Sequence, residues 1–474
     1  GWWLPSFIPE NDEDYKVLTS IPSELLFRKS RDIDVDSLKT PISKYTIPHP
    51  SYKRLDKDCS KCVILDFKWM SPPPFETPTK NKEVKTKYLE MLMHMALATI
   101  YDMGYNSIDF TTTYPLAFGY NKYKEYKELL QGEIIPSVSR ETGMTVNFPV
   151  NTYDDTIEFV SESSAARARF STADHQIVVD IGGGTTDISL SKDGNLLVID
   201  SVEYGGNHFV AALAKESNLI SSALKISDDL KPNELELQIM INRVIRSEDG
   251  FKKAILDNID NTDTGKIERI NCKLEFFING ILEYIKILVT KYNIKGKATL
   301  YPVGNAWKFM EASTNNIGLE EYIKDYLGKE FEVNMGAYES GKQVVAEGAL
   351  QNTRFRHPDL HLPVKTIAGC DGIQIGAEYI DKNAEIPYYL SMDDQDSAKP
   401  PNASTKTFID NYQRKPIGSV GLSTIFEEFN TEIENALYLS GESDFNKDPS
   451  KSKWCLRKSP FVIFLEKIIP KYYL

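Results

Sequence analysis

Apolar residues along the chain alternate between two kinds of spacing, and this alternation predicts an α/β protein. Short runs typical of buried or half-buried strands are found at residues 63–69, 107–113, 156–160, 177–181, 187–191, 195–202 and 297–303. Segments with an apolar residue every three or four positions, as in amphipathic helices, are found at residues 83–103, 122–131, 163–170, most of 206–300, and 340–352. Strands that alternate with helices in this way are typical of mixed sheets covered by helices.

The two ends of the chain have a different character. Residues 15–28 are predicted to be extended, and residues 30–60 are polar and Pro-containing, which indicates a loop-rich insertion. After residue 357 the sequence contains short extended pieces. We therefore expect a linker at residues 358–366 and a small separate C-terminal unit at residues 367–474.

The charge balance narrows the classes of partner. Lys and Arg number 55 against 68 Asp and Glu, a net charge of −13, which argues against a general nucleic-acid or anionic-membrane binder. No apolar run approaches the roughly 18 residues that span a bilayer, and the first residues lack a signal-peptide pattern. The chain has five cysteines, and the lone pair Cys59 and Cys62 lacks the further ligands of a zinc site. We expect a reduced, cytoplasmic protein whose natural start lies upstream of Gly1.

The strongest signal for chemistry is the segment 180–187, which reads Asp-Ile-Gly-Gly-Gly-Thr-Thr-Asp. An apolar strand delivers a carboxylate to its end, and a glycine-rich turn follows. Phosphate oxygens need backbone N–H groups at close range, and a Cβ obstructs that approach. The predicted phosphate-binding residues are Gly182, Gly183, Gly184, Thr185 and Thr186. Asp180 is the predicted magnesium ligand, since Mg²⁺ is held in proteins by one or two carboxylates together with phosphates.

The plain alternative is a tight hairpin without a ligand, but glycines in a row after a strand destabilise it and need a reason. Two other phosphate-binding motifs fit poorly. The Walker lysine is missing, and the glycine spacing is not that of a dinucleotide-binding turn.

The segment 180–187 resembles the second phosphate-binding hairpin of the superfamily that contains actin, sugar kinases and the seventy-kilodalton heat-shock chaperones. Shorter motifs follow in the order of that superfamily: Tyr114-Pro115, Glu162-x-x-Ala165-Ala166, Gly205-Gly206, Val303-Gly304-Asn305 and Val345-Ala346-x-Gly348-Ala349. The superfamily has a second glycine where Asn305 stands. The resemblance covers about residues 15–355.

The resemblance implies a two-lobed actin-like ATPase fold of the ribonuclease H-like kind. Residues 1–160 would form the first lobe and residues 161–339 the second. A closing helix at 340–357 would return to the first lobe, and the C-terminal extension would be β-rich.

The same resemblance implies ATP and Mg²⁺ as ligands and gives individual residues roles. Glu162 would position the attacking water, with a helix-capping carboxylate as the alternative. Gly205 and Gly206 would open a helix toward the phosphates, while Gly304 and Asn305 would approach the ribose or adenine. Other assignments stay open: Asp187 is expected to stabilise the hairpin, and Trp307 or Lys308 would cover the base unless Trp307 belongs to the core.

Within the superfamily the chaperones are most similar. Residues 20–27 resemble their third strand, residues 359–364 resemble their acidic and apolar linker, and residues 372–387 are similar to the start of their β-rich substrate domain. This implies an ATP-driven, chaperone-like switch whose residues 367–474 bind a protein client or partner.

Two departures and three alternatives accompany this interpretation. The superfamily's first phosphate hairpin is absent before residue 20, and Asn207, His208 and Phe209 stand where the chaperones have Glu and a later Asp. The alternatives are an actin-like filament former, a nucleotide-binding scaffold with little turnover, and a small-molecule kinase. A kinase would need a substrate-binding Asp or Arg that the sequence does not reveal.

Overall fold

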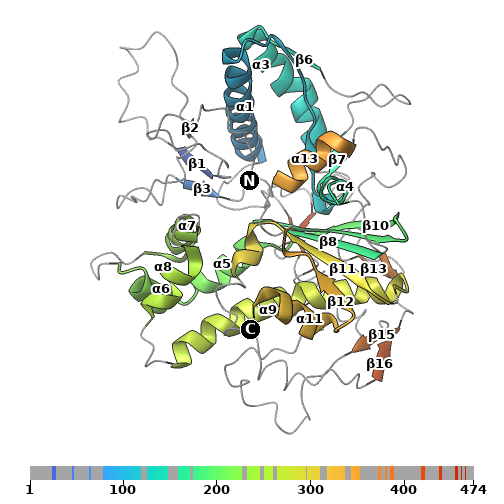
Figure 1. The fold of residues 1–474 in the computed structure, drawn as a ribbon. Coiled ribbons are helices and arrows are strands. Elements are labelled where there is room, and N and C mark those ends of the chain that lie inside the picture. Colours follow the sequence, from blue (N-terminus) through green and yellow to red (C-terminus); the bar gives the residue numbers. More distant parts are fainter. Residues whose placement is uncertain are drawn as a thin grey trace.

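The centre of the protein is a five-stranded mixed sheet (Figure 1), seen in a computed structural model. The structure describes residues 24–27, 45–46, 63–65, 78–118, 125–147, 159–170, 175–226, 232–245, 250–259, 264–294, 296–309, 318–336 and 343–352, six short strands between 372 and 456, and residues 461 and 465.

The sheet has the strand order β10-β9-β8-β11-β12. Its strands are β8 (His175–Ile181), β9 (Thr186–Lys192), β10 (Asn195–Val202), β11 (Ala298–Val303) and β12 (Phe331–Val333). Strands β8, β9 and β10 form an antiparallel meander, while β11 runs parallel to both β8 and β12. The strands predicted at 177–181, 187–191, 195–202 and 297–303 are confirmed, and β12 was not predicted.

Strand β8 is buried on both faces, which explains its continuous apolar run. Ile177, Val179 and Ile181 belong to the largest core cluster, whereas Val178 belongs to a separate cluster on the opposite face. This follows from the alternation of side chains along a strand. Asp180 lies two residues after Val178, so its side chain points to the same face of the sheet as that of Val178.

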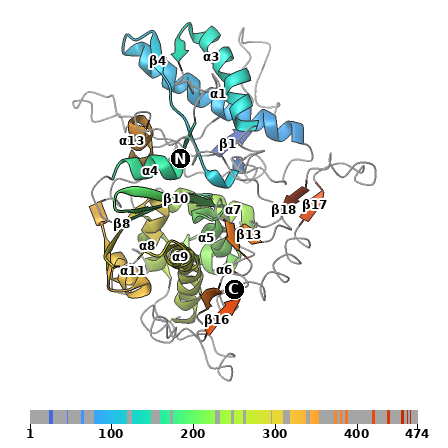
Figure 2. The same ribbon diagram turned by 90° about the vertical axis from the view of Figure 1, so that its right-hand side faces the viewer.

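Helices cover both faces of the sheet (Figures 1 and 2). One face carries α5 (Gly206–Ala214), α9 (Thr264–Lys291) and α11 (Leu319–Leu327), with α6 (Ser217–Ala223), α7 (Glu234–Ile245), α8 (Gly250–Ala254) and the short η6 (Leu256–Asn258) beside them. The helical pattern predicted for most of residues 206–300 is confirmed, whereas α11 was not predicted.

The opposite face carries α4 (Glu162–Ala168) and α13 (Gln343–Asn352), which meet at their backbones. A Cβ placed on Gly348 would lie 1.7 Å from the carbonyl oxygen of Ala165. Beside this contact the Arg169 Nε donates to Glu347 at 2.7 Å. The structure thus brings together the two alanine- and glycine-containing motifs that the sequence places far apart.

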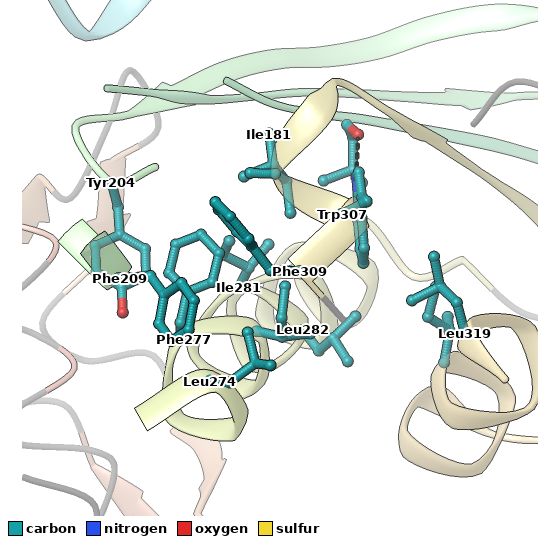
Figure 3. Packing of buried hydrophobic residues seen from close by; sticks show 14 of the residues in the cluster. Ile181, Tyr204, Phe209, Leu274, Phe277, Ile281, Leu282, Trp307, Phe309 and Leu319 are labelled. Carbon is teal, nitrogen blue, oxygen red and sulfur yellow. Dashed lines mark hydrogen bonds between the residues drawn. The ribbon is translucent and has the colours of Figure 1, made fainter. Parts of the chain in front are cut away.

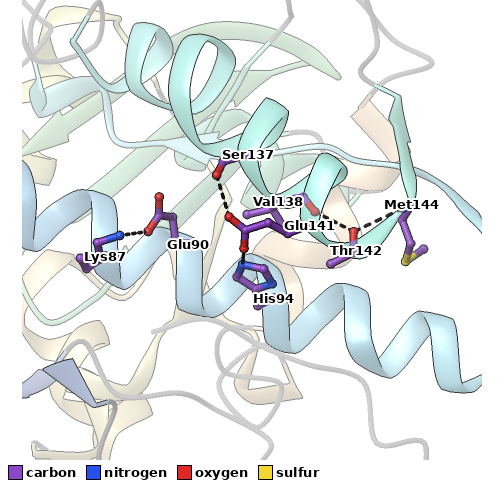
Figure 4. A network of polar contacts seen from close by, with 8 residues as sticks. All are labelled: Lys87, Glu90, His94, Ser137, Val138, Glu141, Thr142 and Met144. Atoms are coloured by element: carbon purple, nitrogen blue, oxygen red, sulfur yellow. Dashed lines mark hydrogen bonds and ion pairs between the residues drawn. The ribbon is translucent and has the colours of Figure 1, made fainter. Parts of the chain in front are cut away.

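A second apolar cluster surrounds α1 (Pro78–Asp102), α3 (Ile135–Thr142) and the π-helical turn η5 (Leu129–Ile134), and reaches Ile199 of β10. An ion pair ties α1 to α3: the Glu141 carboxylate lies 3.0 Å from His94 Nε2, and within α3 it also accepts from Ser137 Oγ at 3.1 Å (Figure 4). These groups are largely exposed, so the contacts add little stability.

The helix predicted at 122–131 continues further than expected and widens into the π-helical turn. Pro136 has no N–H to donate to the carbonyl of Gly132, so the regular helical ladder is interrupted there. The strand predicted at 107–113 is also divided, into β4 (Ser107–Asp109), paired with β6 (Thr145–Asn147), and β5 (Thr113–Tyr114), paired with β7 (Val160–Ser161). The short η4 (Leu116–Phe118) follows β5.

The remaining elements are short. Strands β1 (Glu24–Phe27), β2 (Tyr45–Thr46) and β3 (Val63–Leu65) form one antiparallel sheet. Three antiparallel pairs lie within the expected C-terminal unit: β13 (Gly372–Gln374) with β14 (Tyr379–Asp381), β15 (Glu385–Tyr388) with β16 (Gly418–Gly421), and β17 (Leu437–Leu439) with β18 (Trp454–Leu456). The expected linker at 358–366 lies outside the described residues, and the domain boundaries stay predictions.

Within the part of the chain that the structure describes, none of the helices combines the length and the apolar character that crossing a membrane requires.

Candidate functional site

The carboxyl ends of β8 and β11 form the edge of the sheet where a ligand is most readily held. The two strands are parallel neighbours, with Asp180 in register with Val303. The chain leaves β8 toward β9 on one side and leaves β11 toward β12 on the other side. In open α/β sheets, ligands bind at such a switch point because the loops diverge and leave room between them.

The glycine-rich turn between β8 and β9 lies at this edge and is closed by its own backbone. The amide of Gly182 donates to the carbonyl of Thr185 at 2.8 Å. Gly183 is exposed and Gly184 half-buried, whereas Thr185 and Thr186 are buried. Among the described residues, the amides of Gly183, Gly184 and Thr185 donate no hydrogen bond, and those of the exposed Gly183 and the half-buried Gly184 are the donors that an anion can reach.

The start of α5 holds this turn in place. The amides of Gly206 and Asn207 donate to the carbonyls of Gly182 and Gly183 at 2.9 and 2.7 Å. A Cβ on Gly205 would lie 2.7 Å from the carbonyl oxygen of Gly183, so no other residue fits this contact. With the turn's carbonyls bonded to α5, its amides are left for a ligand. The contacts of Gly205 and Gly206 support a positioning role, because the Gly206 amide is already engaged by the turn.

His208 completes the start of α5. Its Nδ1 accepts the Gly205 amide at 3.1 Å, and its own amide donates to the Gly205 carbonyl at 2.9 Å. Burial lowers the pKa of His208 to about 4, so the ring is neutral at pH 7 with its proton on Nε2. The sequence showed His208 only as a departure from the chaperones. Its place three residues after the N-cap glycine is the signal that predicts a capping role.

Asp180 and Asp187 are buried at the end of the β8–β9 hairpin and lie directly opposite each other. Residues opposite each other in an antiparallel pair point to the same face of the sheet. Gly304, with φ of +92°, makes room for this pair, since a Cβ there would lie 2.3 Å from Asp180 Oδ1 and 2.4 Å from the Ile181 carbonyl oxygen.

Two neighbouring carboxylates at an edge with open amide donors suit Mg²⁺ that arrives with a phosphate. The described ranges contain no group of three or more His, Cys, Asp or Glu residues placed to hold a metal ion.

Glu162 is buried at the first position of α4, one residue after the N-cap Ser161, whose Oγ accepts the Ser164 amide. Burial raises the pKa of Tyr126 well above its usual range, the Thr112 hydroxyl acts in the opposite direction, and the negative charge of Glu162 raises it further. Glu162 therefore lies near Tyr126. Its role toward water stays a prediction.

Trp307, in the turn after β11, was expected either to cover the base of the nucleotide or to belong to the core. The side chain is fully buried, and its indole N–H donates to the Val179 carbonyl at 3.0 Å (Figure 3). Trp307 is thus a core residue and does not cover a base. Asn305 and Lys308 are exposed in and just after the same turn, η7 (Asn305–Trp307), so they can approach a ligand.

The structure brings most of the predicted site residues to one edge. The hairpin 180–187, the α5 start at 205–207 and the turn at 304–306 are in contact with one another: a Cβ on Gly206 would lie 3.2 Å from the Cβ of Ala306. Glu162 begins α4, the helix that packs on the face of the sheet to which Val178 and Asp180 point.

Comparisons with known proteins add little. No known protein-family model matches the chain, and no curated protein matches its sequence. Among solved structures the chain is similar to the ethanolamine utilization protein EutJ from Carboxydothermus hydrogenoformans, with 19% identity and a TM-score of 0.32, over 56% of this chain and 75% of that chain. A likeness of this size carries no argument, so the function is inferred from the site itself.

Proposed function

We propose that the chain binds ATP together with Mg²⁺ at the edge formed by β8 and β11, and that it hydrolyses ATP as a chaperone-like conformational switch of the actin and heat-shock chaperone superfamily. The observation that carries this proposal is the glycine-only contact between α5 and the hairpin. It leaves the amides of Gly183 and Gly184 open at the point where the sheet's loops diverge.

The triphosphate is recognised by fixed backbone dipoles. Amides held in place before the ligand arrives stabilise negative charge without reorganising. Gly183 is exposed and has no Cβ, so phosphate oxygens can come within hydrogen-bond distance of its amide. Bound Mg²⁺ would neutralise charge on the β- and γ-phosphates, and Asp180, with Asp187 opposite, would hold it through direct or water-mediated contacts.

Hydrolysis would then depend on positioning, because phosphoryl transfer needs little covalent chemistry from the protein. Glu162 is the carboxylate that we expect to orient the attacking water. Closure on the nucleotide would shift α4 against α13, and residues 367–474 would present a different surface to a protein client or partner.

Binding is tested by calorimetric titration of the full chain with ATP, with Mg²⁺ or with EDTA. We expect micromolar or tighter binding, a dissociation constant of about 1 μM or less, that weakens at least about tenfold without Mg²⁺. The variant Asp180→Asn keeps the shape of the side chain and should bind equally with and without Mg²⁺. AMP serves as the control ligand because it lacks the phosphates that the hairpin recognises. Equal binding of AMP and ATP, or no binding of ATP, would refute the proposal.

Turnover needs a separate measurement. Phosphate release in a single turnover should slow by about 100-fold or more in Glu162→Gln, since acid–base groups usually contribute from about 100-fold upward, while the affinity for ATP stays unchanged. A wild-type chain that binds ATP and releases no phosphate would be a nucleotide-binding scaffold.

A further inference from the structure

Two residues of the expected C-terminal unit are buried in the core of the central sheet. Phe461 and Leu465 are 0% and 1% exposed and belong to the same cluster as β8, α5 and α9. Both are helical and lie four positions apart, so their side chains lie on one face. A segment that the sequence assigns to a separate unit therefore contributes to the core beside the candidate site.

Three residues form the seat that receives this segment: Tyr204, Gly280 and Tyr284. The Phe461 ring lies 5.1 Å from the Tyr204 ring and 5.3 Å from the Tyr284 ring, edge to face with the latter. Tyr284 is held in place because its hydroxyl donates to the buried Asp200 carboxylate at 2.5 Å. The aromatic side of the seat is thus fixed by the hydrogen bond between α9 and β10.

Gly280 provides the aliphatic side of the seat. It lies in the interior of α9, where glycine weakens a helix relative to alanine. A Cβ at this position would lie 2.7 Å from Leu465 Cδ1. The space that Leu465 occupies gives a reason for the glycine.

Tyr204 joins the seat to the phosphate-binding hairpin. Its carbonyl accepts the Thr186 hydroxyl at 2.7 Å, and its ring lies 5.0 Å from that of His208. The next residue, Gly205, begins the helix whose amides hold the carbonyls of the turn. One side chain therefore separates Phe461 from the backbone that orients the phosphate-binding amides.

We propose that the seat of Tyr204, Gly280 and Tyr284 is the docking site for the segment carrying Phe461 and Leu465, and that docking holds the hairpin in its phosphate-binding geometry. The effect on nucleotide rests on the proposed function, whereas the effect on the hairpin does not. Coupling between two binding events is reciprocal. Nucleotide on the hairpin therefore strengthens docking of the segment.

The seat is tested first by a double-mutant cycle on the full chain. Gly280→Ala should change the urea midpoint less favourably in the wild-type chain than in a Leu465→Ala chain, because the added methyl group must displace the end of the Leu465 side chain. In a Leu465→Ala background the same change should raise the midpoint, because alanine favours the helix and the space is free. Equal midpoint changes in the two backgrounds would overturn the docking of Leu465.

The coupling is tested by hydrogen exchange of the full chain with Phe461→Leu, a milder change than truncation to alanine, so that the variant stays folded. We expect at least severalfold faster exchange of the bonded amides of Gly182, Gly206 and Asn207. The control Leu350→Ala, at a 64% exposed position of α13, should leave them unchanged.

The same experiment with ATP and Mg²⁺ separates the two proposals. If ATP gives no protection but Phe461→Leu still speeds exchange in the hairpin, the nucleotide proposal fails and the docking proposal stands. If hairpin exchange is the same in Phe461→Leu and wild type, the docking proposal is overturned, whatever ATP does.

Discussion

Replacement of Gly304 by alanine is the substitution for which the structure predicts the largest combined loss of stability and of ligand binding. Gly304 has φ of +92° and ψ of 156°, a region that only glycine readily adopts. Forcing another residue into such a conformation costs about 1–3 kcal/mol. The added Cβ would also lie 2.4 Å from the Ile181 carbonyl oxygen, and relief of such overpacking costs about 1–3 kcal/mol more.

The free energy of unfolding of Gly304→Ala should therefore fall by about 4 kcal/mol, the middle of the summed ranges. With a urea m-value of about 3 kcal/mol per molar, the midpoint falls by more than 1 M. Far-UV circular dichroism of the full chain in urea measures this shift. Because the same Cβ meets Asp180 Oδ1, the variant should also lose the Mg²⁺ dependence of nucleotide binding.

Gly194→Ala is the matched control. Gly194 also has positive φ, +75°, but a Cβ there meets nothing within 4 Å. It should cost only the conformational part, about 1–2 kcal/mol. If Gly304→Ala lowers the free energy of unfolding no more than Gly194→Ala does, the turn after β11 does not approach the hairpin as closely as described. The arrangement of the candidate site would then be wrong.

Three further predictions follow from the contacts. Gly348→Ala places a methyl group against the Ala165 carbonyl and should lower the free energy of unfolding by about 3 kcal/mol, measured in urea. Burial lowers the pKa of His208 to about 4, against about 6.5 in the unfolded chain, so the free energy of unfolding should fall progressively as the pH drops from 6.5 to 4. This loss is at most about 3 kcal/mol. The variant His208→Asn should not show it when unfolding is measured as a function of pH. Tyr284→Phe removes the hydrogen bond to the buried Asp200 carboxylate and should cost about 1.5–3 kcal/mol in the same urea assay.

Two control variants test whether these losses arise from the named contacts. Gly132→Ala adds a methyl group in open space and should not reproduce the loss seen at Gly348, and Tyr101→Phe, at a 62% exposed position, should be near neutral. A Gly348 variant as stable as wild type would contradict the close helix contact. An unchanged pH profile in the His208 variant would contradict the neutral cap.

The sequence predicted most of the second half of the fold because local signals and tertiary context agree there. Strands β8 to β11 are apolar runs bounded by glycine turns, and α9 has helical spacing. Elements that depend on residues elsewhere in the chain were not predicted. The three residues of β12, at the edge of the described sheet beside β11, are too few to show a strand pattern. The π-helical turn depends on Pro136 acting on the turn before it.

For the site, the sequence identified the residues that touch each other but not which atoms remain open to a ligand. The sequence predicts Gly205 and Gly206 at the phosphates, and the structure adds that the Gly206 amide donates to the hairpin. Spacing alone does not show whether an amide is already engaged. The burial of Trp307 and of Phe461 could not be predicted either, because each depends on partners more than a hundred residues away.

Calorimetric titration of the wild-type chain and of Gly183→Ala with ATP and Mg²⁺ tests the central claim most directly. Gly183 is exposed, and a Cβ there would come no closer than 3.5 Å to another atom, so the fold should be unaffected. The methyl group would nevertheless stand where phosphate oxygens must approach the turn. The account predicts an unchanged urea midpoint and an affinity for ATP at least about tenfold weaker, or about 1.4 kcal/mol. Equal affinity of the two chains, or no binding by the wild type, would contradict it.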